Sequence, residues 1–174
     1  SVDGSPTYVR EVGERLGARE GFAVEQALFE EYETDRRFDT IVATHILEHV
    51  EDPVAVTRRA LEWVAPEGRL VVAVPNALSI HRLAAVRMGL LGDAHELNER
   101  DHNLGHRRVY DPAELRGDLE RAGWSVQSMG GVFLKVLTNA QIEEWFTPEM
   151  EQGFYALGEE FPENAAEIYA VCSP

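Results

Sequence analysis

Three residues in the first third of the chain could act together on a substrate. His45, Glu48 and His49 stand at positions i, i+3 and i+4, so their side chains would share one face of a helical turn. Histidine titrates near neutral pH, so His45 or His49 could be a general base that removes a proton from a hydroxyl or an amine. Two other interpretations stay open. The three side chains could hold a divalent metal ion together with His106, or Glu48 and His49 could only brace a turn.

A second group of polar side chains follows in the same part of the chain. All six histidines lie between positions 45 and 106, and the polar segment 92–110 has no regular period. A loop of that length is often functional, and arginine in it can clamp a carboxylate or phosphate through two hydrogen bonds. The residues expected to contact a substrate are His81, His102, Arg107, Arg108 and Tyr110, while Phe133 and Lys135 could approach the same pocket after Gly130-Gly131. For any single one of them, the alternative is a solvated residue paired with nearby acids.

Short apolar runs alternate with helical patterns and would position these side chains. Strands are predicted over 22–25, 38–44, 70–74, 124–137 and 165–171, with a turn at 66–68. Helices are predicted after the caps Ser5-Pro6, Asp52-Pro53 and Asp111-Pro112, and over 78–91 and 139–157. This alternation predicts an α/β fold with a doubly wound, mostly parallel sheet, whose ligands bind at the carboxyl ends of the strands.

Composition excludes several classes of protein. The chain carries 31 acidic and 16 basic residues, a net charge of −15, which argues against binding to duplex nucleic acid or to an anionic membrane. A single cysteine excludes an internal disulfide framework. No apolar run approaches the ~20 residues of a membrane span, and the first residues do not resemble a signal peptide. We therefore expect a cytoplasmic protein.

Four segments together resemble one known family. They are the strand 38–42 with His45 to Pro53 after it, the strand and preceding loop at 61–75, the strand end Val2 to Pro6, and 105–110 followed by a helix. These segments resemble the class I S-adenosylmethionine-dependent methyltransferases, in particular the small-molecule subfamily with Leu-Glu-His-Val after its fourth strand. The resemblance covers nearly the whole chain, expected as a single domain over 1–174, and implies a sheet whose last strand is antiparallel.

The resemblance also assigns roles to individual residues. It implies that Asp3, followed by Gly4, accepts hydrogen bonds from the ribose hydroxyls of S-adenosylmethionine, and that the loop 92–110 covers the acceptor site. Related subfamilies hold a divalent ion with an E-x-x-E-H pattern, in which His45 here replaces the first Glu and favours a softer ion such as Zn²⁺. We do not favour that metal over a histidine base. The remaining cofactor contacts implied are Ala27, Leu28 and Phe29 for adenine, and Thr44 with His45 beneath the cofactor.

One family feature is absent from the sequence. The Gly-rich cofactor loop and its strand would precede Ser1, so we expect the domain to be incomplete at its N-terminus. The expected function is methyl transfer to an oxygen or nitrogen of a small molecule, such as a sugar or a secondary metabolite. The alternatives are a metal-assisted O-methyltransferase and a methyltransferase-like protein that binds without catalysis. The acidic last helices carry aromatic residues that would pack inward or join two copies in a homodimer.

Overall fold

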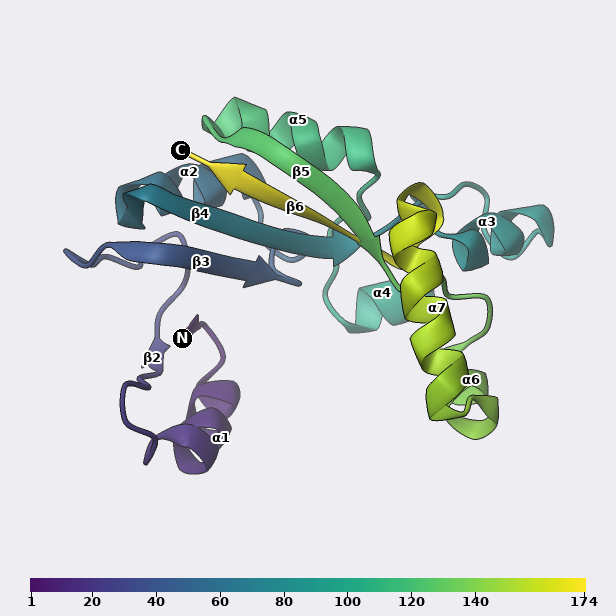
Figure 1. Ribbon diagram of the computed structural model, residues 1–174, viewed down its shortest axis with the longest axis horizontal. Coiled ribbons are helices and arrows are strands. Elements are labelled where there is room, and N and C mark those ends of the chain that lie inside the picture. Colours follow the sequence, from purple (N-terminus) through teal and green to yellow (C-terminus); the bar gives the residue numbers. More distant parts are fainter. The chain divides into compact units, whose positions relative to one another are not determined.

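The computed structural model describes all 174 residues, which form two compact units, 1–36 and 37–174 (Figure 1). In the first unit, β1 (Val2–Asp3) pairs in parallel with β2 (Glu25–Gln26), and α1 (Pro6–Leu16) connects them. The helix begins as expected, because the Ser5 side chain accepts a hydrogen bond from the Tyr8 N–H. The strand predicted over 22–25 is wrong in its bounds, since its only partner, β1, is two residues long.

The second unit is built on a four-stranded mixed sheet. Its spatial order is β3-β4-β6-β5, and β3 pairs in parallel with β4. β6 runs antiparallel to both of its neighbours, so the other three strands share one direction. This confirms the expected α/β fold with an antiparallel last strand. The strands are β3 (Phe38–Thr44), β4 (Val64–Pro75), β5 (Ser125–Val132) and β6 (Glu167–Ser173).

The turn predicted at 66–68 lies inside a strand. β4 begins at Val64, opposite Phe38, and the next pair is Thr40 with Arg69, so the extra residues of β4 form a bulge. Gly68 sits where the two strands come closest, because a Cβ there would lie 2.9 Å from the Phe38 carbonyl oxygen. The turn residues therefore shape a strand rather than end it.

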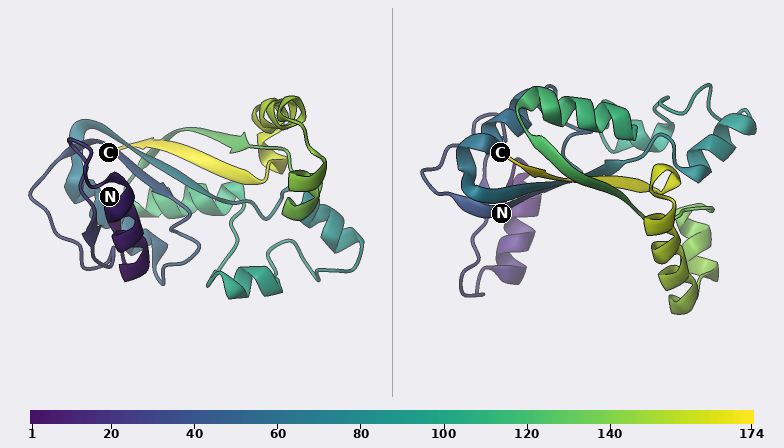
Figure 2. Two further views of the ribbon diagram at one scale, coloured as in Figure 1. Left: turned by 90° about the horizontal axis from the view of Figure 1, so that it is seen from below. Right: turned by 45° about the horizontal axis from the view of Figure 1, so that its top comes forward.

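Two helices cover one face of this sheet (Figure 2). α2 (Pro53–Trp63) and α5 (Pro112–Ala122) contact each other, and the Trp124 indole N–H donates to the Thr57 carbonyl at 2.8 Å. Both begin at the predicted caps, and Asp111 forms a full capping box with Glu114. The core beneath them consists of fully buried apolar side chains: Leu47, Leu70, Val72, Val74, Leu115, Leu119 and Ile168.

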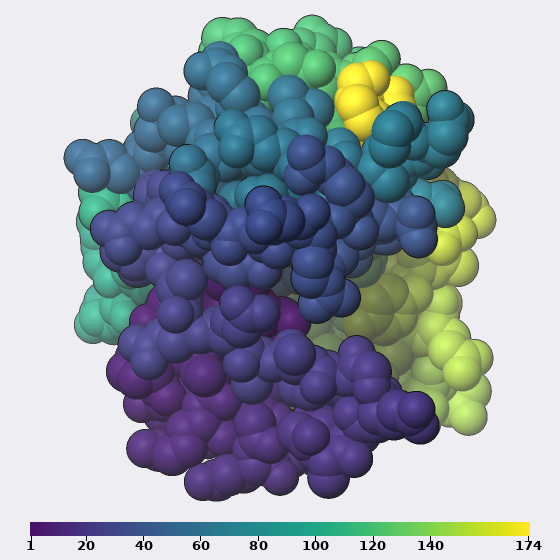
Figure 3. Space-filling model, turned by 90° about the vertical axis from the view of Figure 1, so that its left-hand side faces the viewer, coloured from purple at the N-terminus to yellow at the C-terminus, as the bar shows by residue number.

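β3 is one of the two edge strands of this sheet. It pairs only with β4, and its residues lie at the surface of the second unit in Figure 3. Its carboxyl end leads directly into the predicted histidine cluster. The last residue of the strand, Thr44, is exposed, and the following residue, His45, leaves it with a positive φ of 55°.

The remaining helices are α3 (Ile80–Arg87), α4 (Glu99–Asn103), α6 (Asn139–Trp145) and α7 (Pro148–Glu160), with a 3₁₀ turn over Pro162–Asn164. α3 is shorter than the helix predicted over 78–91, and α4 interrupts the predicted loop 92–110. The helix predicted over 139–157 is two helices, because Pro148 lacks an N–H and disfavours a helical residue before it. None of the helices is long and apolar enough to cross a membrane.

Candidate functional site

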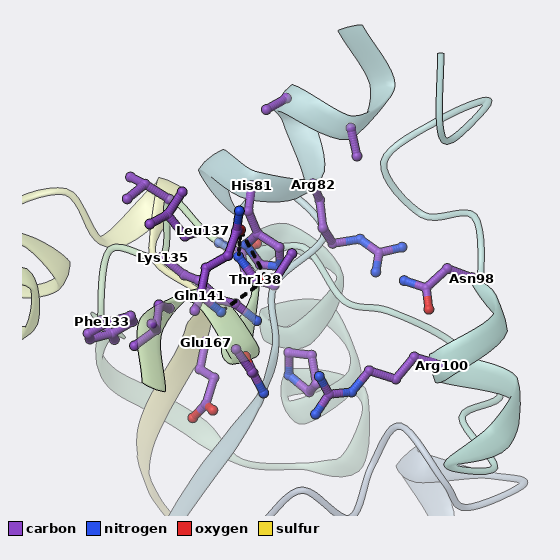
Figure 4. Close-up of a pocket in the computed structure, with 18 of the residues that line it drawn as sticks. His81, Arg82, Asn98, Arg100, Phe133, Lys135, Leu137, Thr138, Gln141 and Glu167 are labelled. Carbon is purple, nitrogen blue, oxygen red and sulfur yellow. Dashed lines mark hydrogen bonds between the residues drawn. The ribbon is translucent and has the colours of Figure 1, made fainter. Parts of the chain in front are cut away.

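A cavity of about 980 Å³ opens at the carboxyl end of β4 (Figure 4). Its walls come from β4, β6, α3, α4, α6, α7 and the segment 133–138 after β5, all within the second unit. The polar side chains that face it include His45, Asn76, His81, Arg100, Lys135 and Glu167. The carboxyl end of a parallel strand is where the sequence predicted a ligand.

His45 stands at one wall of this cavity, between two carboxylates. Its Nδ1 lies 3.2 Å from Glu48 Oε1, and its Nε2 lies 3.4 Å from Glu167 Oε1. The left-handed backbone at His45 costs about 1–3 kcal/mol for a residue with a Cβ, a strain that is typical of functional sites. The His45 N–H donates to the Ala73 carbonyl at 2.9 Å, which ties this turn to β4.

Glu48 is fully buried beneath His45. Its Oε1 also lies 3.9 Å from His49 Nε2, and its Oε2 has no hydrogen-bond partner. A carboxylate only accepts hydrogen bonds, so Glu48 favours the tautomer of His45 that carries its proton on Nδ1. In that tautomer Nε2, which lies 3.4 Å from Glu167 Oε1, is the nitrogen without a proton.

The structure brings three of the four predicted metal-ligating residues together. Glu48, His49 and His106 each offer one ligand atom, and these atoms lie within 4.8 Å of one another. The imidazole rings of His49 and His106 pack edge to face, with 4.8 Å between their centroids. Burial, together with the nearby His49, lowers the pKa of His106. The His106 Nδ1 has no hydrogen-bond partner, although it lies 3.4 Å from Asp101 Oδ1. A buried carboxylate with neutral imidazoles is a donor set that suits zinc.

Arg107 and Arg108 lie outside the cavity lining. The Arg107 Nε donates to the His49 carbonyl at 3.0 Å. The Arg108 guanidinium donates to the carbonyls of Leu47, Val50 and Glu51. These arginines therefore fasten the end of segment 92–110 to the turn that carries His45. The expected clamp on a substrate anion is not supported by these contacts.

Two further predicted substrate contacts also lie away from the cavity lining. Tyr110 is buried, and its hydroxyl donates to Asp118 Oδ2 at 2.9 Å. Burial and the neighbouring Asp118 raise the pKa of Tyr110. His102 is exposed on α4. Neither Tyr110 nor His102 lines the cavity that His45 faces.

His81 does line the cavity, from α3 (Figure 4). Burial, followed by the nearby charges of Lys135 and Arg82, lowers its pKa to about 4. Its Nδ1 is buried without a hydrogen-bond partner. At neutral pH His81 is therefore an uncharged donor or acceptor beside a cationic group.

Arg82, the next residue, also lines the cavity and holds the loop 92–110. Its guanidinium donates to the carbonyls of Ala94 and Glu96 and to Asp101 Oδ2, the last at 3.0 Å. Asp101 in turn completes a capping box with Asn98 at the start of α4. A buried ion pair and hydrogen bonds to two carbonyls thus connect α3 to this loop.

Sequence reasoning missed Glu167 and Arg100. Glu167 pairs with Pro75 across β4 and β6, and this register places it next to His45. That antiparallel register leaves no local signal in the sequence. Arg100 lies within the segment singled out as functional, but its short helix was not predicted.

The predicted cofactor residues of the first unit lie close to one another. Asp3 ends β1, and its Oδ1 accepts a hydrogen bond from the Ser5 N–H at 2.8 Å. A Cβ on Gly4 would lie 3.1 Å from Leu28 Cδ2, and the Ala27 N–H donates to the Asp3 carbonyl at 3.2 Å. Leu28 is exposed, and Phe29, in the turn after it, is half-buried. Their role in binding stays a prediction.

Comparison with known proteins shows the family of this chain. A family model described as "Methyltransferase domain" matches residues 3–129. The ubiquinone biosynthesis O-methyltransferase of Azorhizobium caulinodans is 26% identical over 155 residues, which are 87% of this chain and 56% of the relative. The chain therefore spans little more than half the length of that relative.

Solved structures share the fold at low sequence identity. An S-adenosylmethionine-dependent methyltransferase from Mesorhizobium loti superposes with a TM-score of 0.64 at 14% identity, over 99% of this chain and 78% of that one. The N-methyltransferase NodS of Bradyrhizobium japonicum, solved in complex with S-adenosyl-L-homocysteine, gives 0.56 at 13% identity, over 98% and 63%. These similarities show the fold.

Proposed function

Because the chain belongs to the methyltransferase-domain family of class I S-adenosylmethionine-dependent methyltransferases, we propose that it transfers a methyl group from that cofactor to an oxygen or nitrogen of a small molecule. The observation that carries the proposal is His45, held between the carboxylates of Glu48 and Glu167 at the wall of the 980 Å³ cavity. Fixed contacts on both ring nitrogens orient an imidazole for proton transfer.

The residues of the chain would handle the proton that methylation releases. When bound, S-adenosylmethionine supplies a sulfonium methyl group, whose carbon–sulfur bond breaks as the new bond to the acceptor forms. The acceptor hydroxyl or amine gives its proton to His45 Nε2, and the resulting imidazolium lies between two carboxylates that stabilise it. Most of the rate enhancement would come from holding the reacting groups close and aligned.

Asp3 is the candidate for binding the cofactor ribose. One of its carboxylate oxygens is used by the Ser5 N–H, and the other is left to accept a hydroxyl hydrogen bond. A carboxylate at a strand end followed directly by a helix start fits a group that presents hydroxyl donors. The same strand end is where the family resemblance places the ribose.

Substitution of His45 tests this proposal. His45→Ala should lower kcat for transfer of a labelled methyl group to a panel of phenols, amines and sugars by about 10²–10⁴-fold, the range of general-base catalysis. The affinity for S-adenosyl-L-homocysteine should stay unchanged. His95→Ala is the matched control, since His95 is exposed and lies outside the cavity lining. Equal losses of turnover and cofactor affinity in His45→Ala would contradict a base.

A second candidate function is metal-assisted O-methylation. It is favoured by the cluster of Glu48, His49 and His106, in which the buried Glu48 Oε2 and the His106 Nδ1 both lack hydrogen-bond partners. Burying such groups without a partner is costly, and a divalent ion would satisfy them. These three residues would hold the ion, which would supply Lewis acidity that makes an acceptor hydroxyl easier to deprotonate.

Calorimetric titration with Zn²⁺ separates the two candidates. The metal-assisted function expects saturable binding that Glu48→Gln and His106→Ala each abolish, and activity that a chelator removes. His45→Ala should leave that binding within a few-fold, because His45 is not part of the cluster. Full activity in the presence of chelator would leave His45 as the base without a metal.

A further inference from the structure

Lys135 is the only lysine of the chain, and it faces the cavity from segment 133–138 (Figure 4). The residue is half-buried, yet its ammonium forms no hydrogen bond or salt bridge within the described structure. The chain carries 31 acidic residues, yet none of them forms a salt bridge with Lys135. A half-buried charge without a partner is unfavourable unless a ligand supplies one.

A second unpartnered cation reaches the same space. Arg100, an exposed residue of α4, extends into the cavity in Figure 4, and its guanidinium forms no hydrogen bond or salt bridge either. The two residues line the same cavity, and burial followed by the nearby charge of Arg100 lowers the pKa of Lys135. Two like charges converging on one space, with uncharged His81 beside them, form a site for an anion.

The carboxylates that line the cavity are engaged elsewhere or lie in solvent. Glu167 contacts His45 at 3.4 Å, and buried Asp101 is paired with Arg82 at 3.0 Å. Glu143 and Glu151 belong to α6 and α7 and are exposed. Glu167 favours the charged form of Lys135 without coming within salt-bridge distance. An acidic ligand group would therefore find both cations free.

Part of the cavity wall is apolar and exposed. Met88 is 70% and Leu104 is 53% exposed, and Val136 and Tyr155 lie in the same wall. Phe133 also lies in this wall. Phe133 and His45 are the two non-glycine residues with a positive φ. Both strained residues of the chain thus face one cavity, as expected where a fold is shaped for a ligand.

We propose that the acceptor is an amphiphilic anion, an apolar body with a carboxylate or phosphate, whose acidic group binds Lys135 and Arg100 while its nucleophile faces His45. This inference rests on the proposed function for the identity of the reacting group. The anion site itself stands on the two unpartnered cations and the apolar wall. It gives the methyl acceptor a second attachment point, away from the reacting atom.

Four catechol probes test the inference by calorimetric titration: 3,4-dihydroxyphenylpropionate, its methyl ester, the corresponding amine 3,4-dihydroxyphenethylamine, and 3,4-dihydroxyphenethylphosphonate. The carboxylate should bind about tenfold more tightly than the ester, the difference expected for one charge-assisted hydrogen bond. A phosphonate that binds more tightly still would assign a phosphate, and a weaker one would assign a carboxylate. Equal binding of acid and ester, tighter binding of the amine, or no binding of the acid at millimolar concentration would overturn the inference.

Matched variants show which side chains cause the preference for the acid over the ester. Lys135→Met and Arg100→Met should each remove most of the preference for the acid, and Lys135→Arg should restore it. Arg87→Met is the control, because Arg87 is an exposed cation on α3 that lies outside the cavity lining. An unchanged preference in both Met variants, with unchanged thermal unfolding, would also overturn the inference.

A separate titration with S-adenosyl-L-homocysteine keeps the two proposals apart. Binding of this compound without any preference for acidic probes would remove the anion site and leave the methyltransferase proposal intact. A preference for the acidic probes without binding of S-adenosyl-L-homocysteine would keep the anion site and contradict the methyltransferase proposal.

Discussion

His45 shows how much chemistry depends on one backbone turn. Its positive φ places the imidazole between Glu48, which belongs to the same turn, and Glu167, which arrives from the last strand. The nearby contact was predictable from the i, i+3 spacing. The distant one was not, because it depends on the register of β4 with β6. The sequence thus predicted His45 as the candidate base and half of its surroundings.

Glu167→Gln tests the distant partner. The change keeps the size of the side chain but removes the charge that stabilises protonated His45, so kcat should fall about tenfold. Glu163→Gln, an exposed change in the turn before β6, is the control. A Glu167→Gln enzyme with unchanged kcat would leave Glu167 without a role in proton transfer.

His81 makes stability depend on pH in a defined direction. Its pKa is lowered from 6.5 to about 4 in the folded protein, so the unfolded chain takes up the proton first as the pH falls. The free energy of unfolding should therefore decrease as the pH falls from about 6.5 to about 4, with no further loss from this group below that. Urea unfolding at about pH 7.5 and about pH 5.5 should show a smaller decrease in His81→Gln than in the parent protein. Identical decreases in both proteins would contradict the assignment.

At the scale of elements, the local signals in the sequence were read correctly wherever a cap decides the structure. Asp52 and Asp111 begin helices at the predicted residues. The errors lie where tertiary contacts decide. The turn at 66–68 became a bulge because β3 pairs alongside it, and α4 formed because Arg82 anchors its first turn through Asp101. Neither partner is near in sequence.

Arg108 was expected to contact a substrate, and in the structure it holds the turn 47–51. Its three hydrogen bonds to carbonyls of the turn 47–51 come from one charged group. Arg108→Met should lower the free energy of unfolding by about 2–4 kcal/mol, because three carbonyls, two of them in part-buried hydrogen bonds, lose charge-assisted partners. Arg116→Met, which removes an exposed pair with Glu120, should cost less than about 1 kcal/mol. Chemical denaturation measures both, and equal small losses would show that Arg108 does not hold the turn.

The aromatic residues of α6 and α7 were expected to pack inward or to join two copies. Phe146 and Phe154 pack against each other at 5.0 Å between ring centroids, and both surround Phe133. The contact is close, since a Cβ on Gly158 of α7 would lie 2.3 Å from the Phe133 nitrogen. Trp145 stays 55% and Tyr155 52% exposed. The inward alternative therefore describes Phe146 and Phe154, and the homodimer stays a prediction.

At the scale of the whole molecule, the excess of acidic residues governs stability more than function. A net charge of −15 on 174 residues repels itself in the compact state. Raising the salt concentration from about 0.01 M to about 0.15 M shortens the screening length from about 30 Å to about 8 Å. The midpoint of thermal unfolding should rise by about 2–4 °C for each kcal/mol of repulsion relieved. A midpoint that falls with salt would show that ion pairs outweigh the repulsion.

The proposed activity needs a cofactor, and binding of its product tests the account most directly. S-adenosyl-L-homocysteine should be titrated calorimetrically into the full-length protein, the His45→Ala variant and the Asp3→Ala variant. The account predicts saturable binding at micromolar affinity that His45→Ala leaves unchanged and Asp3→Ala weakens at least about tenfold, the loss expected when a carboxylate no longer binds the ribose hydroxyls. No heat of binding up to millimolar concentration in the parent protein would contradict it.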